Sequence, residues 1–480
     1  MIEMTDRLAA ARELLDQHGQ GHVLHFVDQL DDPQRLQLID QIEGIDWPEV
    51  ARLIDSHVLN KPEFKLPEQL EPAPCYGMTP AADQQQKYTD ARALGEQLIR
   101  DGKVAAFTVA GGQGTRLGYD GPKGSFPATP IRKLPLFGIF AEFIIKTQQK
   151  YSSIVPWYVM TSPVNDQPTR EAFEQNDFFG LAPANVSFFP QAMMPAINKT
   201  TGKVLLESPD SLALSPNGHG GSLKALYTSG AIDDMKSRGI EQISYTQVDN
   251  PVVKIIDPLF IGLHALDGAQ MSSKMVAKSE PLERVGNFCL ADGRVAVIEY
   301  SDLPDELALQ RNDDGSIRFN AGSIAIHVIR ADFVESVNTA DGGFGLPFHR
   351  AEKKVPYVDL GSGQQVSPES PNAVKLETFV FDALPMCEKS IVFEADRVEE
   401  FAPIKNASGD GVVDSPATSA DLQVERHARW LEANNIAVPR DGNGQVNAVI
   451  EIKGITAIEP TDLTNVELPG SVEPGSELLL

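Results

Sequence analysis

Cysteine, long apolar runs and positive charge are all scarce in this chain of 480 residues, and each shortage excludes a class of protein. The three cysteines, Cys75, Cys289 and Cys387, are far apart and form no Cys-x-x-Cys pattern. This usage argues against a disulfide framework and a zinc site, and it indicates reduced thiols in a cytoplasmic protein. No apolar run approaches the about 20 residues that span a membrane, and the N-terminus lacks a signal-peptide pattern.

The charge balance limits the partners further. The chain has 41 lysines and arginines against 67 acidic residues, which gives a formal net charge of −26. A nucleic-acid surface needs a basic face, so this balance argues against a nucleic-acid partner. A phosphate site remains compatible with it, because a few local cations outweigh acidic groups that lie beyond the screening length of about 10 Å.

Hydrophobic periodicity divides the chain into three expected regions. Residues 1–100 are predicted to be helical, and residues 101–405 alternate apolar strands with amphipathic helices. That alternation predicts an α/β domain with a mixed, mostly parallel, Rossmann-like central sheet flanked by helices. Residues 406–480 contain two Val/Ile-rich runs and are expected to form a small β-rich C-terminal unit.

The expected elements of the middle region place its polar motifs. Strands are expected at Val104–Ala110, Val155–Thr161, Val186–Phe189 and Gln242–Val248, and helices at Ala81–Arg100, Leu136–Thr147, Thr169–Asn176 and Leu223–Met235. Asp292-Gly293 between two apolar runs predicts a hairpin. Ligands of such sheets bind at the carboxyl ends of the strands, where the loop after Ala110 and Asp249 both fall.

The most informative segment follows the first of these strands. It reads Gly111-Gly-Gln-Gly-Thr-Arg-Leu-Gly118 and is followed by Pro122-Lys123-Gly124. Glycines let the main chain approach an anion closely, and Arg116 and Lys123 place two cations beside it. The segment predicts a nucleotide-binding loop, although a glycine-rich turn without a ligand would use the same glycines.

Two well-known phosphate-binding loops do not match this spelling. The dinucleotide fingerprint G-x-G-x-x-G would require glycine where Leu117 stands. The P-loop requires a glycine directly before its lysine, whereas Pro122 precedes Lys123. The loop therefore belongs to another class of nucleotide site.

The segment instead resembles the signature G-G-x-G-T-R-L-G…P-K of sugar-nucleotide pyrophosphorylases. Further motifs follow in the order of that family, over about residues 85 to 430: Val159–Pro163, Phe188–Pro195, Val248–Asn250, Val297–Ser301, Phe319–Ser323 and Phe401–Asn406. Together they are most similar to the eukaryotic-type UDP-N-acetylglucosamine pyrophosphorylases, with UDP-glucose pyrophosphorylases as more distant relatives. The resemblance implies the nucleotide-diphospho-sugar transferase fold.

The resemblance also implies a reaction. A sugar 1-phosphate oxygen would attack the α-phosphorus of UTP and release pyrophosphate, with UTP and the sugar phosphate as small-molecule substrates. Such a transfer needs aligned anions and neutralised charge more than covalent help. Mg²⁺ would be the cofactor, held by Asp249, because this ion accepts one or two carboxylates plus phosphate oxygens and water.

The family pattern assigns the remaining roles residue by residue. Arg116, Lys123 and Lys405 are expected to act on the phosphates in catalysis, and Gln191 to read uracil through its amide. The full nucleotide set is Gly111, Gly112, Gly114, Lys123, Gln191, Gly218, Asp249 and Lys375, and the sugar set is His219, Glu299, Tyr300, Asn320 and Lys405. Residue type alone would also fit a surface arginine, an exposed glutamine, solvated lysines and a capping aspartate.

One residue departs from the pattern. His219 stands where N-acetylglucosamine enzymes usually have asparagine, and the Gly-His-Gly spelling is associated with UDP-glucose and broader UDP-sugar enzymes. Gly221, where glucose enzymes usually have aspartate, agrees with the N-acetylglucosamine type. An imidazole is larger than a carboxamide and has one neutral donor, so the sugar stays open between the two.

Two other classes of protein remain as alternatives. A nucleotide-sugar glycosyltransferase would share the α/β fold and a metal aspartate, but it would usually show a D-x-D motif, which Val248-Asp-Asn250 is not. A non-catalytic UDP-sugar-binding regulator would keep affinity without turnover. The presence of Arg116, Lys123 and Lys405 argues against that regulator, because binding alone needs no cation at the departing pyrophosphate.

Overall fold

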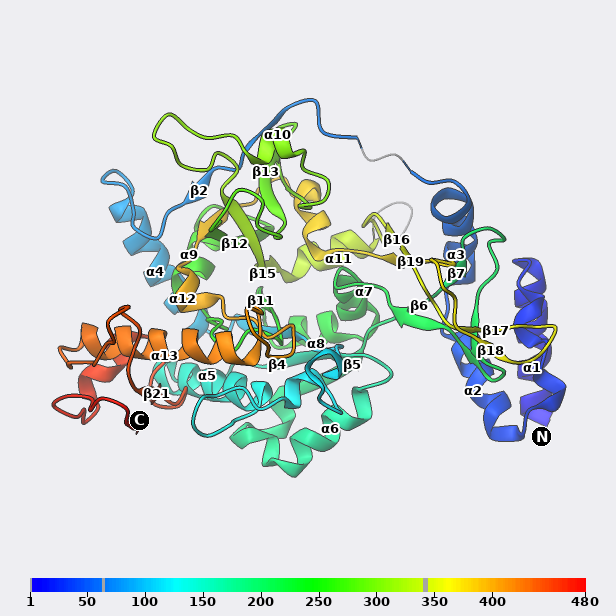
Figure 1. Cartoon of the computed structure of the whole chain (residues 1–480), viewed down its shortest axis with the longest axis horizontal. Coiled ribbons are helices and arrows are strands. Elements are labelled where there is room, and N and C mark those ends of the chain that lie inside the picture. The colour runs from blue at the N-terminus through cyan, green and yellow to red at the C-terminus, as the bar shows by residue number, and fades with distance from the viewer. Residues whose placement is uncertain (1, 63–64, 340–343) are drawn as a thin grey trace. The chain divides into compact units, whose positions relative to one another are not determined.

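The computed structural model describes residues 2–62, 65–339 and 344–480 (Figure 1). Contacts divide the chain into two compact units, of which unit 1 comprises Met1–Lys65, Gln191–Ala225 and Gly345–Val380, and unit 2 comprises Leu66–Pro190, Leu226–Phe344 and Phe381–Leu480. These boundaries differ from the three regions expected from the sequence. The reason is that unit 1 joins segments far apart in the chain, which local periodicity does not reveal.

Unit 2 is built on an 11-stranded sheet. Eight strands follow the order β2-β20-β12-β15-β11-β3-β4-β5, and β13 carries β1 and β14 beside the start of β15. The strands are β1 (Leu70–Pro72), β2 (Cys75–Tyr76), β3 (Val104–Val109), β4 (Trp157–Thr161), β5 (Val186–Pro190), β11 (Gln242–Gln247), β12 (Met271–Ala277), β13 (Asn287–Ala291), β14 (Arg294–Ile298), β15 (Ala321–Arg330) and β20 (Val392–Glu394).

The pairing confirms a mixed, mostly parallel sheet. Strand β3 runs parallel to β11 and β4, β4 runs parallel to β5, and β12 runs parallel to β20. Strand β15 is antiparallel to both β11 and β12, which lie on either side of it (Figure 1). The carboxyl ends of β3, β4, β5, β11, β12 and β20 therefore share one edge, called the carboxyl edge below, and β15 begins at that edge.

Helices cover this sheet because its central strands are buried on both faces. Every residue of β4 is buried, as are the first five of β3. The core between strands and helices contains the aromatic rings of Phe137, Trp157 and Phe173, which contact one another. The helices are α4 (Gln85–Arg100), α5 (Leu136–Tyr151), α6 (Asp166–Gln175), α8 (Ala231–Ser237), α9 (Pro258–Leu266), α10 (Asp305–Ala308), α11 (Ala331–Thr339), α12 (Arg397–Glu400) and α13 (Pro416–Ala433).

Two local predictions have different outcomes. The hairpin expected at Asp292-Gly293 is confirmed, since β13 and β14 pair around a turn in which both residues have positive φ, at 47° and 82°. The single helix expected over Leu223–Met235 is two helices, α7 (Gly221–Thr228) and α8. Gly230 separates them with a left-handed φ of 79°, which an α-helix cannot contain.

Unit 1 packs the N-terminal helices against small sheets. The helices are α1 (Ile2–Gln17), α2 (Asp32–Glu43) and α3 (Trp47–Leu53), and the strands are β6 (Met193–Pro195), β7 (Ile197–Asn198), β8 (Leu206–Ser208), β9 (Ser211–Leu212), β10 (Leu214–Pro216), β16 (His349–Lys353), β17 (Tyr357–Val358), β18 (Gln365–Val366) and β19 (Ala373–Glu377). Trp47, Leu38, Ile197 and Val374 belong to one buried cluster. Helical and strand segments thus share one core here.

The C-terminal residues 406–480, all of them described, contain fewer strands than expected. They form helix α13 and a parallel pair of three-residue strands, β21 (Val449–Glu451) and β22 (Glu477–Leu479). Helix α13 lies beside α5, where the Arg426 guanidinium is 5.8 Å from the Phe143 ring (Figure 1). Among the helices of the described residues, none combines the length and apolar character needed to cross a membrane.

The Glu451 carboxylate ties these C-terminal residues to the rest of unit 2. This side chain is almost completely buried, and it accepts hydrogen bonds from Arg132 Nε at 2.5 Å and from the backbone N–H groups of Ile131 and Arg132 at 2.8 and 2.9 Å. Arg132 also pairs with Glu142 of helix α5. The C-terminal residues are therefore an integral part of unit 2.

Helices α4 and α9 pack backbone against backbone, and two glycines make this possible. A Cβ on Gly95 would lie 1.8 Å from the Pro258 carbonyl oxygen, and a Cβ on Gly262 would lie 1.6 Å from the Ala91 carbonyl oxygen. Any larger residue would force the helices apart. Because α9 begins directly after Asp257, this contact also sets the position of the Asp257 segment.

We predict that Gly95→Ala lowers the free energy of unfolding by about 2 kcal/mol or more, because the added methyl group has no space. At an exposed helix position the same change would stabilise by about 1 kcal/mol. Ala93→Gly, at an exposed position of the same helix, is the control and should cost about 1 kcal/mol. Urea denaturation followed by circular dichroism measures both, and a Gly95→Ala variant as stable as the parent would contradict the close contact.

Candidate active site

The glycine-rich segment forms a closed loop at the carboxyl edge, directly after β3. Its two arms are joined by hydrogen bonds from Gly114 N to Gly121 O at 3.0 Å and from Lys123 N to Gly112 O at 3.1 Å. Two 3₁₀ turns lie on the loop, at Thr115–Leu117 and Lys123–Ser125. These hydrogen bonds within its own main chain fix the shape of the loop.

The glycines of this loop are required for different reasons. A Cβ on Gly114 would lie 2.7 Å from the Tyr119 ring, so packing within the loop excludes a side chain there. A Cβ on Gly112 would have no heavy atom of the described chain within 4 Å, and Gly112 does not have a positive φ. Neither packing nor conformation explains this glycine, and its open side is where a ligand can approach the main chain.

Asn165, which the sequence analysis did not single out, holds the loop from the neighbouring strand end. Its fully buried side chain donates from Nδ2 to the carbonyl oxygens of Ala110 (2.9 Å) and Gly112 (3.2 Å). Its Oδ1 accepts from Ser162 N at 2.7 Å. Asn165 lies two residues beyond the Val159–Pro163 motif, and only the packing of β4 beside β3 reveals its role.

The structure brings Lys123 and Asp249 together at the carboxyl edge. Lys123 Nζ lies 3.6 Å from Asp249 Oδ2, and the two side chains are 17% and 13% exposed. In the described residues no group of three or more His, Cys, Asp or Glu side chains is arranged to hold a metal ion. Asp249 would thus offer one carboxylate, which fits Mg²⁺ if nucleotide phosphates and water supply the other ligands.

The other two residues predicted to act in catalysis, Arg116 and Lys405, belong to the same unit. Arg116 is exposed on the first 3₁₀ turn of the loop. Lys405 is 42% exposed, with Nζ 3.9 Å from Asp414 Oδ2 and 5.5 Å from the Phe401 ring centre. The preceding residue, Ile404, donates its N–H to the Asp249 carbonyl oxygen at 2.8 Å, so Lys405 follows directly after a contact with the Asp249 segment.

The predicted sugar residues Glu299, Tyr300 and Asn320 cluster where β14 ends and β15 begins. Asn287 of β13 pairs with Ile298 on one side and with Gly322 on the other. Glu299 therefore follows the end of β14 and Asn320 precedes the start of β15, on either side of Asn287. Asn320 Oδ1 accepts from Lys278 N at 2.9 Å, and Tyr300 is half exposed. This cluster lies at the carboxyl edge, because β15 begins there.

The remaining predicted residues, Gln191, Gly218, His219 and Lys375, lie in unit 1. Three segments meet there: Asn217 N donates to Ala192 O, a Cβ on Gly218 would lie 2.3 Å from Thr378 O, and Lys375 is on β19. Gly218 has a φ of 83°, so conformation and packing both require glycine at this position. The structure thus groups the ten predicted residues of unit 2 and, separately, the four of unit 1.

The His219 ring is held rigidly within unit 1. Its Nδ1 accepts a hydrogen bond from Val380 N at 3.1 Å, and the ring stacks on Phe379 with 5.2 Å between centres. His349 stacks on the same Phe379 ring at 4.5 Å. Burial, and to a lesser degree the nearby His349, lower the pKa of His219 from 6.5 to about 4, so at neutral pH the ring is uncharged and carries its proton on Nε2.

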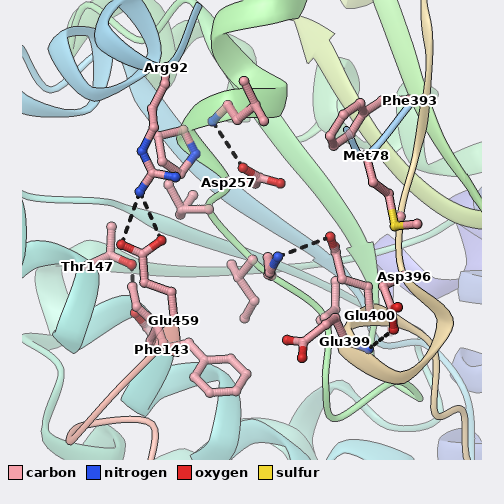
Figure 2. Close-up of a pocket in the computed structure, with 18 of the residues that line it drawn as sticks. Met78, Arg92, Phe143, Thr147, Asp257, Phe393, Asp396, Glu399, Glu400 and Glu459 are labelled. Carbon is pink, nitrogen blue, oxygen red and sulfur yellow. Dashed lines mark hydrogen bonds and ion pairs between the residues drawn. The ribbon is translucent and has the colours of Figure 1, made fainter. Parts of the chain in front are cut away.

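A cavity of about 220 Å³ elsewhere in unit 2 is not the predicted site (Figure 2). Its walls come from helices α4, α5, α12 and α13 and from residues 253–259. Arg92 and Glu459 form an ion pair at 2.9 Å on one wall, and Asp257 and Glu400 lie on others (Figure 2). None of the predicted nucleotide, sugar or metal residues lines this cavity.

We predict that the His219 imidazole titrates near pH 4 in the folded protein, not near its ordinary 6.5. The unfolded chain therefore binds this proton more readily, and His219 favours unfolding as the pH falls from 6.5 to about 4. NMR of the ring C–H signals, assigned with His219→Asn, measures the midpoint. A midpoint near 6.5 would contradict the burial of the ring.

Comparison with known proteins shows the family of the chain. The family model described as UTP--glucose-1-phosphate uridylyltransferase matches residues 71–450. A Dictyostelium discoideum protein named probable UDP-N-acetylglucosamine pyrophosphorylase is 37% identical over 463 residues, which are 94% of this chain and 93% of that protein. The Saccharomyces cerevisiae UDP-N-acetylglucosamine pyrophosphorylase is 32% identical, over 92% of this chain and 93% of its own.

A solved structure agrees over the whole length as well. The uridine diphosphate N-acetylglucosamine pyrophosphorylase of Trypanosoma brucei matches with a TM-score of 0.82 and 25% identity, covering 99% of this chain and 98% of its own. The fold and the ordered motifs thus agree with both comparisons. The chain belongs to the UTP--glucose-1-phosphate uridylyltransferase family and is a nucleotidyltransferase of the UDP-sugar pyrophosphorylase type.

Proposed function

We propose that this uridylyltransferase forms UDP-N-acetylglucosamine and pyrophosphate from UTP and N-acetylglucosamine 1-phosphate. The observation that carries the proposal is the full-length match to relatives named for that sugar, at 37% and 32% identity. The glycine loop, Lys123 and Asp249 at one edge of the sheet support the nucleotidyl-transfer part of it.

In the proposed reaction, an oxygen of the sugar 1-phosphate forms a bond to the α-phosphorus of UTP. The bond from that phosphorus to the oxygen bridging it to the β-phosphate breaks, and pyrophosphate leaves with the bonding electrons. The backbone of Gly111, Gly112 and Gly114 would hold the triphosphate, and the Lys123 ammonium would neutralise part of its charge. Arg116 would face the departing pyrophosphate, and Lys405 the sugar phosphate. These contacts act by alignment and charge neutralisation.

Mg²⁺, held by Asp249 when bound, would neutralise phosphate charge at the reacting centre. The proximity of Lys123 Nζ to Asp249, at 3.6 Å, supports this placement. A single carboxylate balanced by a lysine has little charge left for a free ion, so the ion would enter together with the triphosphate. We accordingly assign Asp249 to a shared metal–nucleotide site.

The remaining residues keep the roles that the family pattern gives them, and each unit is described by itself. In unit 1, Gln191, Gly218 and Lys375 would contact the nucleotide and His219 the sugar. In unit 2, Glu299, Tyr300 and Asn320 would contact the sugar hydroxyls and the acetamido region. The geometry of His219 supports its proposed role at the sugar. Because Nδ1 of the neutral ring accepts from Val380 N, the proton is on Nε2, and the ring offers a single N–H donor whose direction is fixed.

The same proposal places the enzyme in the cytoplasm. All three cysteines are free thiols, of which Cys75 is exposed and the other two are buried. Burial raises the pKa of Cys289 and of Cys387 to about 12, so these two thiols stay protonated and serve as small apolar groups. Their state supports a reducing compartment.

We predict pyrophosphate release from UTP and Mg²⁺ with N-acetylglucosamine 1-phosphate, at a kcat/KM about tenfold or more above that with glucose 1-phosphate. A panel with N-acetylgalactosamine and galactose 1-phosphates completes the test. Preference for glucose 1-phosphate would support the UDP-glucose alternative and point to His219. No release with any sugar phosphate would overturn the proposal in favour of a non-catalytic UDP-sugar-binding protein.

We predict that His219→Asn raises the preference for N-acetylglucosamine 1-phosphate over glucose 1-phosphate by about fivefold, the worth of one modest hydrogen bond. Asparagine is the residue usual at this position in N-acetylglucosamine enzymes. The matched control is His349→Asn, which removes the other imidazole that stacks on Phe379 and should leave the preference unchanged. If the ratio of kcat/KM for the two sugar phosphates is the same in both variants and in the parent, other residues select the sugar.

A further inference from the structure

Asn250, next to Asp249, uses its whole side-chain amide to join two loops of unit 2. Its Nδ2 donates to the Glu400 carbonyl oxygen at 2.6 Å, and its Oδ1 accepts from Ala402 N at 3.1 Å. The residue is 5% exposed. Both ends of the amide thus contact backbone, which indicates a structural role for this buried side chain.

A third hydrogen bond extends this connection. Ile404 N donates to the Asp249 carbonyl oxygen at 2.8 Å. Residues 249–250 and 400–404 are therefore held side by side over their whole length. Asp249, the proposed metal ligand, belongs to the first segment, and Lys405, the proposed sugar-phosphate cation, directly follows the second.

The 400–404 segment is in turn anchored to the sheet by a buried charge. Lys274 of β12 has no exposed side-chain surface, and its Nζ lies 2.6 Å from Asp257 Oδ2 and 2.7 and 2.6 Å from the two carboxylate oxygens of Glu400. The Glu400 side chain is 3% exposed. Its carboxylate is fixed by Lys274, and its carbonyl oxygen accepts from Asn250.

The two carboxylates of this anchor also belong to the cavity wall. Asp257 and Glu400 both line the cavity (Figure 2). Lys254, another lining residue, has Nζ 3.7 Å from the Glu400 carboxylate. Glu400 is therefore held by charges, while its main chain alone bonds to the Asn250 amide.

We propose that Asn250 is a positioning residue for uridylyl transfer, which sets the distance between Asp249 and Lys405 through the Lys274–Glu400 anchor. The inference rests on the proposed roles of Asp249 and Lys405. Asn250 touches no reacting atom. Its effect is to keep Lys405 at a fixed position relative to Asp249. Alignment of the phosphates in the transition state depends on this position, whereas ground-state binding of UTP is also supported by the glycine loop.

The first test compares Asn250→Ala with the parent enzyme. We expect kcat to fall at least tenfold while the KM for UTP changes less than threefold. Without any substrate, the backbone amides of Ala402 and Ile404 should exchange hydrogen faster, because their acceptors are lost or loosened. A kcat within twofold of the parent would overturn the proposal, whatever the exchange rates.

Asn434→Ala is the matched control. Asn434 also donates from Nδ2 to two backbone carbonyls of unit 2, those of Trp430 at 2.9 Å and Pro460 at 3.0 Å. The control should lower the melting temperature without changing kcat or the exchange of residues 402–404. A kcat loss equal to that of Asn250→Ala would mean that general loosening explains both variants, and would overturn the positioning role.

A double-mutant cycle with Lys405→Ala separates this inference from the proposed function. If Asn250 acts through Lys405, the double variant should lose no more kcat than the poorer single variant; losses that multiply would overturn that route. A normal kcat in Lys405→Ala would remove Lys405 from the proposed mechanism. In that event a loss in Asn250→Ala alone would support positioning of Asp249, and no loss would overturn the inference.

Discussion

The arrangement of unit 2 depends on one lysine ammonium with no access to water. Removing Lys274 Nζ from solvent is costly, and its hydrogen bonds to the Asp257 and Glu400 carboxylates offset that cost. These carboxylates hold the ammonium in its charged form by keeping the pKa of Lys274 above its ordinary value, against the opposing effect of burial. A buried ion cluster of this kind contributes little net stability, but it permits only one arrangement of the Lys274 ammonium and the Asp257 and Glu400 carboxylates.

That arrangement connects a strand, the start of a helix and the active-site edge. Asp257 accepts from Leu259 N at 3.0 Å and so begins helix α9, which packs on α4 through Gly95 and Gly262. Glu400 ends helix α12 and leads to Lys405. The strand β12, the helix pair and the active-site edge therefore share one charge centre.

The local part of this structure could be predicted from the sequence, and the non-local part could not. The strand before Gly111, the hairpin at Asp292-Gly293 and the place of Asp249 after β11 follow from short-range patterns and were confirmed. Asn165 and Asn250 carry no such pattern, because a buried amide is recognised only by the backbone groups that a distant segment brings to it. The assembly of unit 1 was missed for the same reason. The roles of the phosphate-binding and sugar-binding residues stay predictions.

The buried Glu451 has a consequence for how the protein is made. The turn at residues 130–132 follows the glycine loop, and its two backbone N–H groups and the Arg132 Nε all donate to a carboxylate 319 residues later than Arg132. During synthesis this turn therefore has no acceptor until Glu451 has left the ribosome. The glycine loop is translated well before that point. The turn that follows the loop can be completed only after 319 further residues have been added to the chain.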